Sequence, residues 1–165
     1  MNFCKFRSWE VLAIIFSTTI VDGIVPFDSY KVVHYLLHSL TIFSYLKWIY
    51  DIAQLLYIQQ IFAKKNSWRF FQFNFIYFIV YIVIIYVLQE YNSIQYSDIA
   101  FWLLIFHLYA SFAIVYFLYV IARNFMCIQL KKDATISEYI ATFFAVWFLP
   151  IGIWWIQPKI RQMAG

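Results

Sequence analysis

The chain has 165 residues, of which 65% are hydrophobic, 24% aromatic and only 12% charged, about half the charged share usual in a soluble domain. A water-soluble fold of this length has too little interior to bury so much apolar surface, so the composition excludes a soluble domain and predicts the lipid bilayer as solvent. The net charge of +4 comes from short basic clusters at segment ends, which does not indicate a nucleic-acid partner. Residues 1–165 have the length of a single integral membrane domain.

Five apolar segments fill most of the chain, each close to or above the roughly 20 residues that a helix needs to cross the hydrocarbon core. The runs are continuous and lack the alternation of barrel strands, which favours helices. The predicted fold is all-α: a polytopic transmembrane helical bundle of four spanning helices and a fifth C-terminal membrane segment broken by Pro and Gly. The segments lie within residues 9–26, 30–62, 69–89, 100–123 and 137–157.

Lysine and arginine residues predict the orientation of these segments. By the positive-inside rule, the N-terminus is cytoplasmic, and residues 90–99, which contain no basic residue, lie outside. The first apolar run resembles a signal peptide, but no small-x-small cleavage pattern follows it, so we interpret it as an uncleaved first span. The basic residues on the predicted cytoplasmic side are Lys5, Arg7, Lys64, Lys65, Arg69, Arg123, Lys131 and Lys132.

The fifth segment is interrupted in its middle by Pro150 and Gly152. Pro removes a backbone donor and Gly permits a turn, and a helix break at membrane depth has to be surrounded by protein or water. A full crossing would also place Lys159 and Arg161 outside, against the positive-inside rule. Two interpretations stay open: a re-entrant or interfacial hairpin with both ends cytoplasmic, and a kinked helix that spans the bilayer.

The stretch FFAVWFLPIGIWWIQPKI occupies residues 143–160. It resembles the closing signature F-W-F-x-P-I-G-I-W-x-I-Q-P-K/R-I-N of a group of small multi-spanning bacterial inner-membrane proteins. The clear match begins near Ser137, and this chain has Val146 where the group usually has Phe and Arg161 where it usually has Asn. The resemblance implies a multi-pass protein of the bacterial inner (cytoplasmic) membrane, and it implies no activity.

Lys47 and Asp51 are the most costly residues to place in a membrane, since a charge at bilayer depth costs about 2.5 to 3.5 kcal/mol. Their i, i+4 spacing puts them on one helix face, which Gln54 extends. Asp22, near the outer end of the first segment, is a further member of this polar membrane stripe. The stripe predicts a path for an ion, a proton or a polar substrate. The alternative is an off-centre crossing that leaves these residues at an interface.

His38 and His107 are predicted at equal depth, roughly 12 Å below the outer surface, if their segments begin near residues 30 and 100. Equal depth allows a bis-histidine haem or a metal ion between two helices, and the alternative is that each histidine hydrogen-bonds to a neighbouring helix. The cysteine and histidine spacings match no zinc motif. We therefore predict no cofactor, with haem as the exception that this pair would allow.

The sequence contains no Gly-rich phosphate loop, nucleophile elbow or paired-carboxylate arrangement, which disfavours an enzyme. We predict a non-enzymatic membrane protein that self-assembles or joins a larger membrane complex, with a pore as one form of that assembly. Oligomerisation would bury the polar stripe or turn it towards water. Two alternatives stay open: a b-type haem or metal-binding redox subunit, and an accessory or regulatory subunit of another membrane machine.

Overall fold

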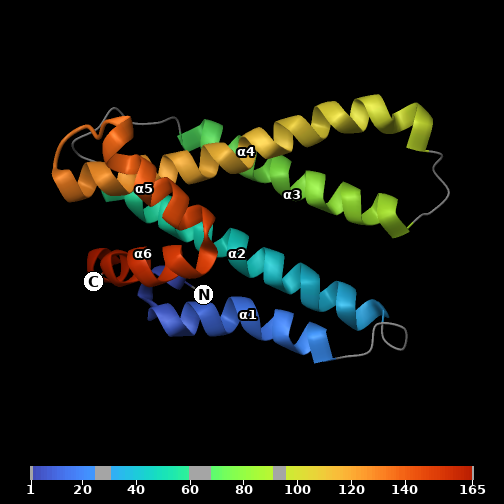
Figure 1. Ribbon diagram of the computed structural model, residues 1–165, viewed down its shortest axis with the longest axis horizontal. Helices are drawn as coiled ribbons and strands as arrows, with labels where there is room; N and C mark the ends of the chain where they lie inside the picture. The colour runs from blue at the N-terminus through green and yellow to red at the C-terminus, as the bar shows by residue number, and fades with distance from the viewer. Residues whose placement is uncertain (1, 25–30, 60–67, 91–95, 165) are drawn as a thin grey trace. The chain divides into compact units, whose positions relative to one another are not determined.

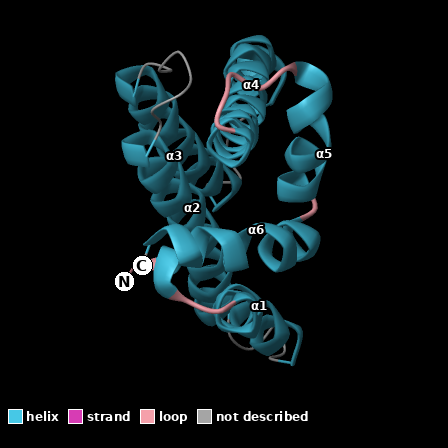
Figure 2. Cartoon of the chain, turned by 90° about the vertical axis from the view of Figure 1, so that its left-hand side faces the viewer, coloured by secondary structure: helices cyan, strands magenta, loops and turns pink. Residues whose placement is uncertain are grey.

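The computed structural model describes residues 2–24, 31–59, 68–90 and 96–164, and every regular element in these ranges is a helix. Figures 1 and 2 show these helices and the loops and turns that join them. The all-α class predicted from the sequence is confirmed. The elements are the 3₁₀-helix η1 (Phe3–Lys5) and the α-helices α1 (Ser8–Ile24), α2 (Lys31–Gln59), α3 (Trp68–Glu90), α4 (Tyr96–Leu130), α5 (Ile136–Trp147) and α6 (Leu149–Ala164).

Two of the described helices, α3 and α4, are long and apolar enough to cross a membrane, over Trp68–Leu88 and Leu103–Leu130. They overlap the third and fourth predicted segments, 69–89 and 100–123, and the α4 span ends seven residues later than predicted. The bent pair of α5 and α6 is a third such span if its two halves cross as one. Among the described residues, α1, with 17 residues, and α2, whose interior is more polar and includes Lys47 and Asp51, do not meet the same standard. The predicted total of four crossings and a fifth segment is therefore not confirmed.

The chain forms two compact units, one of residues 1–63 and 121–165 and the other of residues 64–120. In the first unit, α1 and α2 run side by side in opposite directions (Figure 1). The short helix η1 packs against α2 and α6, and α6 also packs against α1 and α5. The N-terminal residues and the C-terminal helix are thus neighbours within one unit, although they are far apart in the sequence.

The core of the first unit follows the helical period. Trp48, Ile52 and Leu56 recur every four residues along α2, and their side chains are fully buried. On α6 the fully buried side chains include Ile153 and Ile156, which share one face by their i, i+3 spacing. Because each helix buries one face, the opposite face of α2 is left exposed.

In the second unit, α3 pairs with the first part of α4 through a ladder of aromatic contacts. The Phe71 and Phe117 ring centroids are 5.3 Å apart. Further along, Tyr77 meets Tyr109 edge to face, with centroids 4.5 Å apart. Edge-to-face and tilted pairs of this kind add about 0.5–1.5 kcal/mol each beyond the area they bury. Aromatic interlocking therefore holds the two helices that are apolar enough to cross a membrane.

The start of α5 is fixed by a capping box around Thr135 and Glu138. The Thr135 N–H donates to Glu138 Oε2 at 2.8 Å, and the Thr135 hydroxyl donates to the same oxygen at 2.9 Å. Lys132 forms an ion pair with the other Glu138 carboxylate oxygen at 2.5 Å. The first turn of α5 therefore begins where the Thr-x-x-Glu pattern lies in the sequence.

The chain turns sharply between α5 and α6, whose axes differ by 116° (Figure 2). Phe148 links the two helices with the non-helical angles φ −82° and ψ 83°. Pro150 lies in the first turn of α6, where backbone N–H groups have no acceptor within the helix, so proline loses no hydrogen bond there. The fixed φ of proline also favours the start of a helix. Pro150 thus starts the second helix, and the turn itself lies two residues earlier.

Gly152 lets α6 approach α5 closely after this turn. A Cβ atom at position 152 would lie 2.5 Å from the Ala145 carbonyl oxygen and 2.9 Å from Val146 Cα. Both atoms belong to the backbone, so no side-chain rotation would relieve the overlap. The close packing of the two helices therefore requires glycine at this position.

Candidate functional site

The most extensive polar contacts of the first unit surround η1. The Phe3 N–H donates to Asp51 Oδ2 at 2.9 Å. The Gln157 side-chain amide donates to the carbonyl oxygens of Phe3, at 2.6 Å, and of Phe6, at 2.9 Å. A carboxylate on α2 therefore satisfies the N–H of the first η1 residue, and an amide on α6 donates to the carbonyl groups of that residue and of the residue after η1.

Gln157 is fully buried, and every polar atom of its side chain contacts the protein. Its Oε1 accepts from the Trp48 indole N–H at 2.9 Å, while its Nε2 donates to the two carbonyl groups of η1 and the residue that follows it. Because indole nitrogen is only a donor, Trp48 determines which way the amide points. We call Asp51, Trp48 and Gln157 the N-terminal clamp.

Lys47 and Asp51 form an ion pair across one turn of α2. The Asp51 side chain is 8% exposed, whereas that of Lys47 is 35% exposed. Gln54 is exposed, and the side chain of Asp22 lies outside the described part of the chain. The structure thus joins Lys47 to Asp51 and adds the Phe3 N–H as a second partner of the carboxylate. It does not bring Gln54 to the same contact.

Removing Lys47 alone is expected to destabilise the protein more than removing both charges. Lys47→Ala leaves the Asp51 carboxylate buried without its cation, and we expect a loss of about 1–2 kcal/mol once the solvent screening of the partly exposed Lys47 is included. In the double variant Lys47→Ala with Asp51→Asn, the Asn carbonyl still accepts from the Phe3 N–H and no charge is stranded. The free energy of unfolding, measured in mixed micelles, should be higher for the double variant than for Lys47→Ala. A lower value for the double variant would show that Lys47 and Asp51 are not coupled in this way.

Cys4 lies inside the same contact region, with 2% of its surface exposed. Burial, and then the negative charge of Asp51, raise the pKa of the Cys4 thiol to about 12. The thiolate is the reactive form, so the raised pKa makes this thiol inert near neutral pH. Cys4 is therefore a reporter of the clamp rather than a reactive group.

Alkylation of Cys4 by iodoacetamide is expected to be about three orders of magnitude slower at pH 8 than that of an ordinary thiol of pKa about 8.5. The rate should rise about tenfold for each pH unit up to pH 11, because the thiolate fraction grows throughout that range. Quantitative mass spectrometry of the Cys4 peptide measures this rate. A rate that levels off near pH 9 would show that the thiol is not held in the buried site.

In the second unit, polar side chains connect α3 to α4. The Tyr81 hydroxyl and His107 Nδ1 are 2.6 Å apart, and the Tyr77 hydroxyl donates to the Phe106 carbonyl oxygen at 3.1 Å. The second predicted haem ligand, His38, has its side chain outside the described part of the chain. Across the described ranges, no group of three His, Cys, Asp or Glu side chains is placed to hold a metal ion.

The sequence interpretation missed Gln157 and Trp48 as parts of a polar site. The available signal was a single Gln in the apolar run of the fifth segment, since a polar side chain in such a run has to find a partner. For the Phe3 backbone no signal exists, because every residue carries the same peptide groups. Pro150 and Gly152 lie in the first turn of α6, just after the bend at Phe148 and outside the clamp.

The chain matches no known family model, no curated protein and no solved structure. Over the described residues, the structure by itself defines the class: all-α, with two helices long and apolar enough to cross a membrane, or three if the bent α5–α6 pair is one span.

Proposed function

We propose that this protein is a non-enzymatic integral membrane component that works in an assembly, built from further copies of itself or from other membrane subunits. The proposed location is the inner membrane of a bacterium, with the N-terminus cytoplasmic and four crossings besides the α5–α6 segment. The single observation that carries the proposal is an exposed row of side chains on α2.

This row, the α2 stripe, is exposed although most of its members are large and apolar. Leu36, Phe43 and Ile58 are 66%, 62% and 71% exposed. Successive members are three, four or seven residues apart, which places them on one helix face at the spacing of helix–helix seams. The α2 stripe comprises Leu36, Leu40, Phe43, Lys47, Gln54 and Ile58.

Lys47 and Gln54 make the α2 stripe a poor surface for lipid alone. Hydrocarbon offers a polar side chain no hydrogen bond, so polar residues in membrane helices turn towards other helices or towards a water-filled path. An apolar stripe with two polar members therefore favours contact with another helix. In a closed ring of copies, the same stripe would line a pore.

Oxidative cross-linking tests this proposal on the full chain in its native membrane. We expect Phe43→Cys to form a disulfide-linked species through the α2 stripe, because residues at a helix seam approach within disulfide distance. Ile20→Cys is the matched control, because Ile20 is also highly exposed but lies on α1. Native mass spectrometry in nanodiscs then identifies the assembly, as multiples of the 20.0 kDa chain or as a complex with other subunits.

The proposal would be contradicted by a chain that stays monomeric at every concentration and whose Phe43→Cys variant gives no higher yield of cross-linked species than Ile20→Cys.

Ion flux through reconstituted vesicles tests whether the assembly forms a pore. A visible absorption spectrum of the purified protein tests the b-type haem alternative, because bound haem absorbs visible light intensely and the protein alone does not.

A further inference from the structure

Helices α5 and α6 form a helical hairpin with an exposed face of large apolar side chains next to its bend. Three of these side chains are tryptophans, and each of the three is 47–60% exposed. The spacing of three or four residues places the members from each helix on one side of that helix. This face, the aromatic face, comprises Ile140, Phe144 and Trp147 on α5 and Ile151, Trp154 and Trp155 on α6.

The hairpin turns back before it spans the thickness of a bilayer. The 12 residues of α5 make it about 18 Å long, whereas the hydrocarbon core is about 30 Å thick. Because the two axes differ by 116°, α6 runs back along α5, and Figure 1 shows the start of α5 and the end of α6 towards the same end of the pair. The bend therefore lies at one end of the hairpin, and both open ends lie at the other.

The end of α6 lies beside the end of α2. Gln59, the last residue of α2, donates from its side-chain amide to the Met163 carbonyl oxygen at 2.7 Å. Closer to the bend, Gln157 accepts from Trp48 in the interior of α2. The proposed orientation places the end of α2 at the cytoplasmic surface of the membrane. The open ends of the hairpin are thus at that surface, and the bend is displaced towards the bilayer.

The open ends carry an excess of positive charge. Residues 123–165 include five basic and two acidic side chains. Both acidic side chains are already in ion pairs, Asp133 with Arg123 and Glu138 with Lys132. Lys131 precedes α5, Arg161 lies in the last turn of α6, and both side chains are exposed. Positive charge therefore remains at the open ends for an anionic partner.

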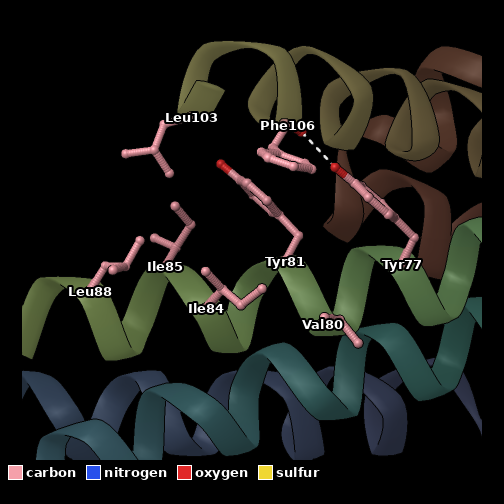
Figure 3. Close-up of a pocket in the computed structure, with 8 residues that line it drawn as sticks. All are labelled: Tyr77, Val80, Tyr81, Ile84, Ile85, Leu88, Leu103 and Phe106. Carbon is pink, nitrogen blue, oxygen red and sulfur yellow. Dashed lines mark hydrogen bonds between the residues drawn. The ribbon is translucent and has the colours of Figure 1, made fainter. Parts of the chain in front are cut away.

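This charge distinguishes the hairpin from the apolar groove between α3 and α4. Figure 3 shows that groove, and none of its described lining side chains is charged. On the hairpin, tryptophans near the bend are instead combined with basic side chains at the open ends. Tryptophan together with lysine or arginine on an amphipathic helix is typical of helices that lie at the surface of anionic membranes.

We propose that the α5–α6 hairpin binds lipid from within one leaflet: the aromatic face contacts acyl chains, and the open ends bind the headgroups of anionic phospholipids. The partner is the cytoplasmic leaflet, whose anionic lipids attract basic segments beside it. The inference rests on the membrane location proposed above and does not depend on the α2 stripe. Failure of Phe43→Cys to cross-link would contradict the proposed assembly and leave this inference standing.

Spin labels on the full chain measure the depth of the hairpin in nanodiscs of equimolar phosphatidylcholine and phosphatidylglycerol. The labelled variants are Ile151→Cys next to the bend and Ser137→Cys and Gln162→Cys at the open ends, all at exposed positions. Collisions with oxygen, which concentrates in hydrocarbon, and with a water-soluble nickel chelate report the depth. We expect the label at position 151 in hydrocarbon and the other two at headgroup level. The wild-type chain, whose two thiols are buried, gives the background.

Three results of these measurements would overturn the proposal. If an impermeant thiol reagent reaches Ser137→Cys from one side of the membrane and Gln162→Cys only from the other, the hairpin crosses the bilayer. If the label at position 151 collides mainly with the nickel chelate, the aromatic face lies in water. If that label collides with neither reagent, a protein surface covers the aromatic face in place of lipid.

Native mass spectrometry of the chain released from the same nanodiscs tests the headgroups. We expect retained phosphatidylglycerol to exceed retained phosphatidylcholine about fivefold, the effect of one basic residue near a membrane surface. Arg161→Gln should lower this ratio about twofold or more. The matched control is Arg69→Gln, which removes an exposed arginine at the start of α3 and should leave the ratio unchanged. Equal ratios in the two variants, or no preference in the wild-type chain, would overturn the proposal.

Discussion

Gln157→Leu is expected to lower the free energy of unfolding by about 2–4 kcal/mol, because it removes the hydrogen-bond partner of two groups at once. These are the Trp48 indole N–H and the Phe6 carbonyl group, whereas the Phe3 carbonyl group loses the Gln157 amide but still accepts from the Phe6 N–H. Leucine nearly matches glutamine in volume, so the loss reports hydrogen bonding rather than a cavity. Reversible unfolding in mixed micelles measures it.

Gln162→Leu is the matched control, since Gln162 lies on the same helix and is exposed. We expect a change within about 0.5 kcal/mol there. A second readout is the Cys4 thiol, which should be alkylated faster in Gln157→Leu as η1 loosens and should stay protected in Gln162→Leu. If Gln157→Leu unfolds like the wild-type chain, the clamp does not stabilise the N-terminus.

Gly152→Val is expected to destabilise the first unit by about 3 kcal/mol or more, the upper end of overpacking effects. Even the first side-chain carbon would lie 2.5 Å from the Ala145 carbonyl oxygen, and the branched side chain adds two further carbons. Gly152→Ala should cost less, because it adds one carbon only. Both variants force α5 and α6 apart at the turn.

The control for this series is Ile151→Ala at the adjacent, exposed position, for which we expect a small effect. Helix content by circular dichroism should stay constant across the series, because the substitutions change packing and not helix formation. Equal stability of Gly152→Val and the wild-type chain would mean that the two helices do not approach closely.

Local patterns in the sequence predicted local structure well. The Thr135-x-x-Glu138 pattern marks the start of α5, because a capping box depends on four consecutive residues. The spacing of Lys47 and Asp51 placed them one turn apart on a helix, where they form their ion pair. Gln54, three residues beyond Asp51, lies on the same side of α2 but is exposed and takes no part in the ion pair.

Features that depend on long-range packing were not predictable. The contact of Gln157 with Phe3 joins residues 154 positions apart, and its acceptor is a backbone carbonyl that no residue type identifies. The turn was assigned to Pro150 and Gly152, whereas it lies at Phe148, because Pro is well suited to the first turn of a helix. The first two predicted crossings stay unconfirmed, because α1 has 17 residues and α2 carries two interior charges, so neither is among the helices that are long and apolar enough by themselves.

The N-terminal clamp also constrains the order in which the chain matures. At about 5–20 residues per second, the ribosome adds Gln157 about 8–30 s after Phe3. During this interval Trp48 and Asp51 are already made, while the amide that bonds the Phe3 and Phe6 carbonyl groups does not yet exist. The residues around Phe3 are therefore made well before the amide that secures them, and Cys4 protection reports the docking of α6 against η1.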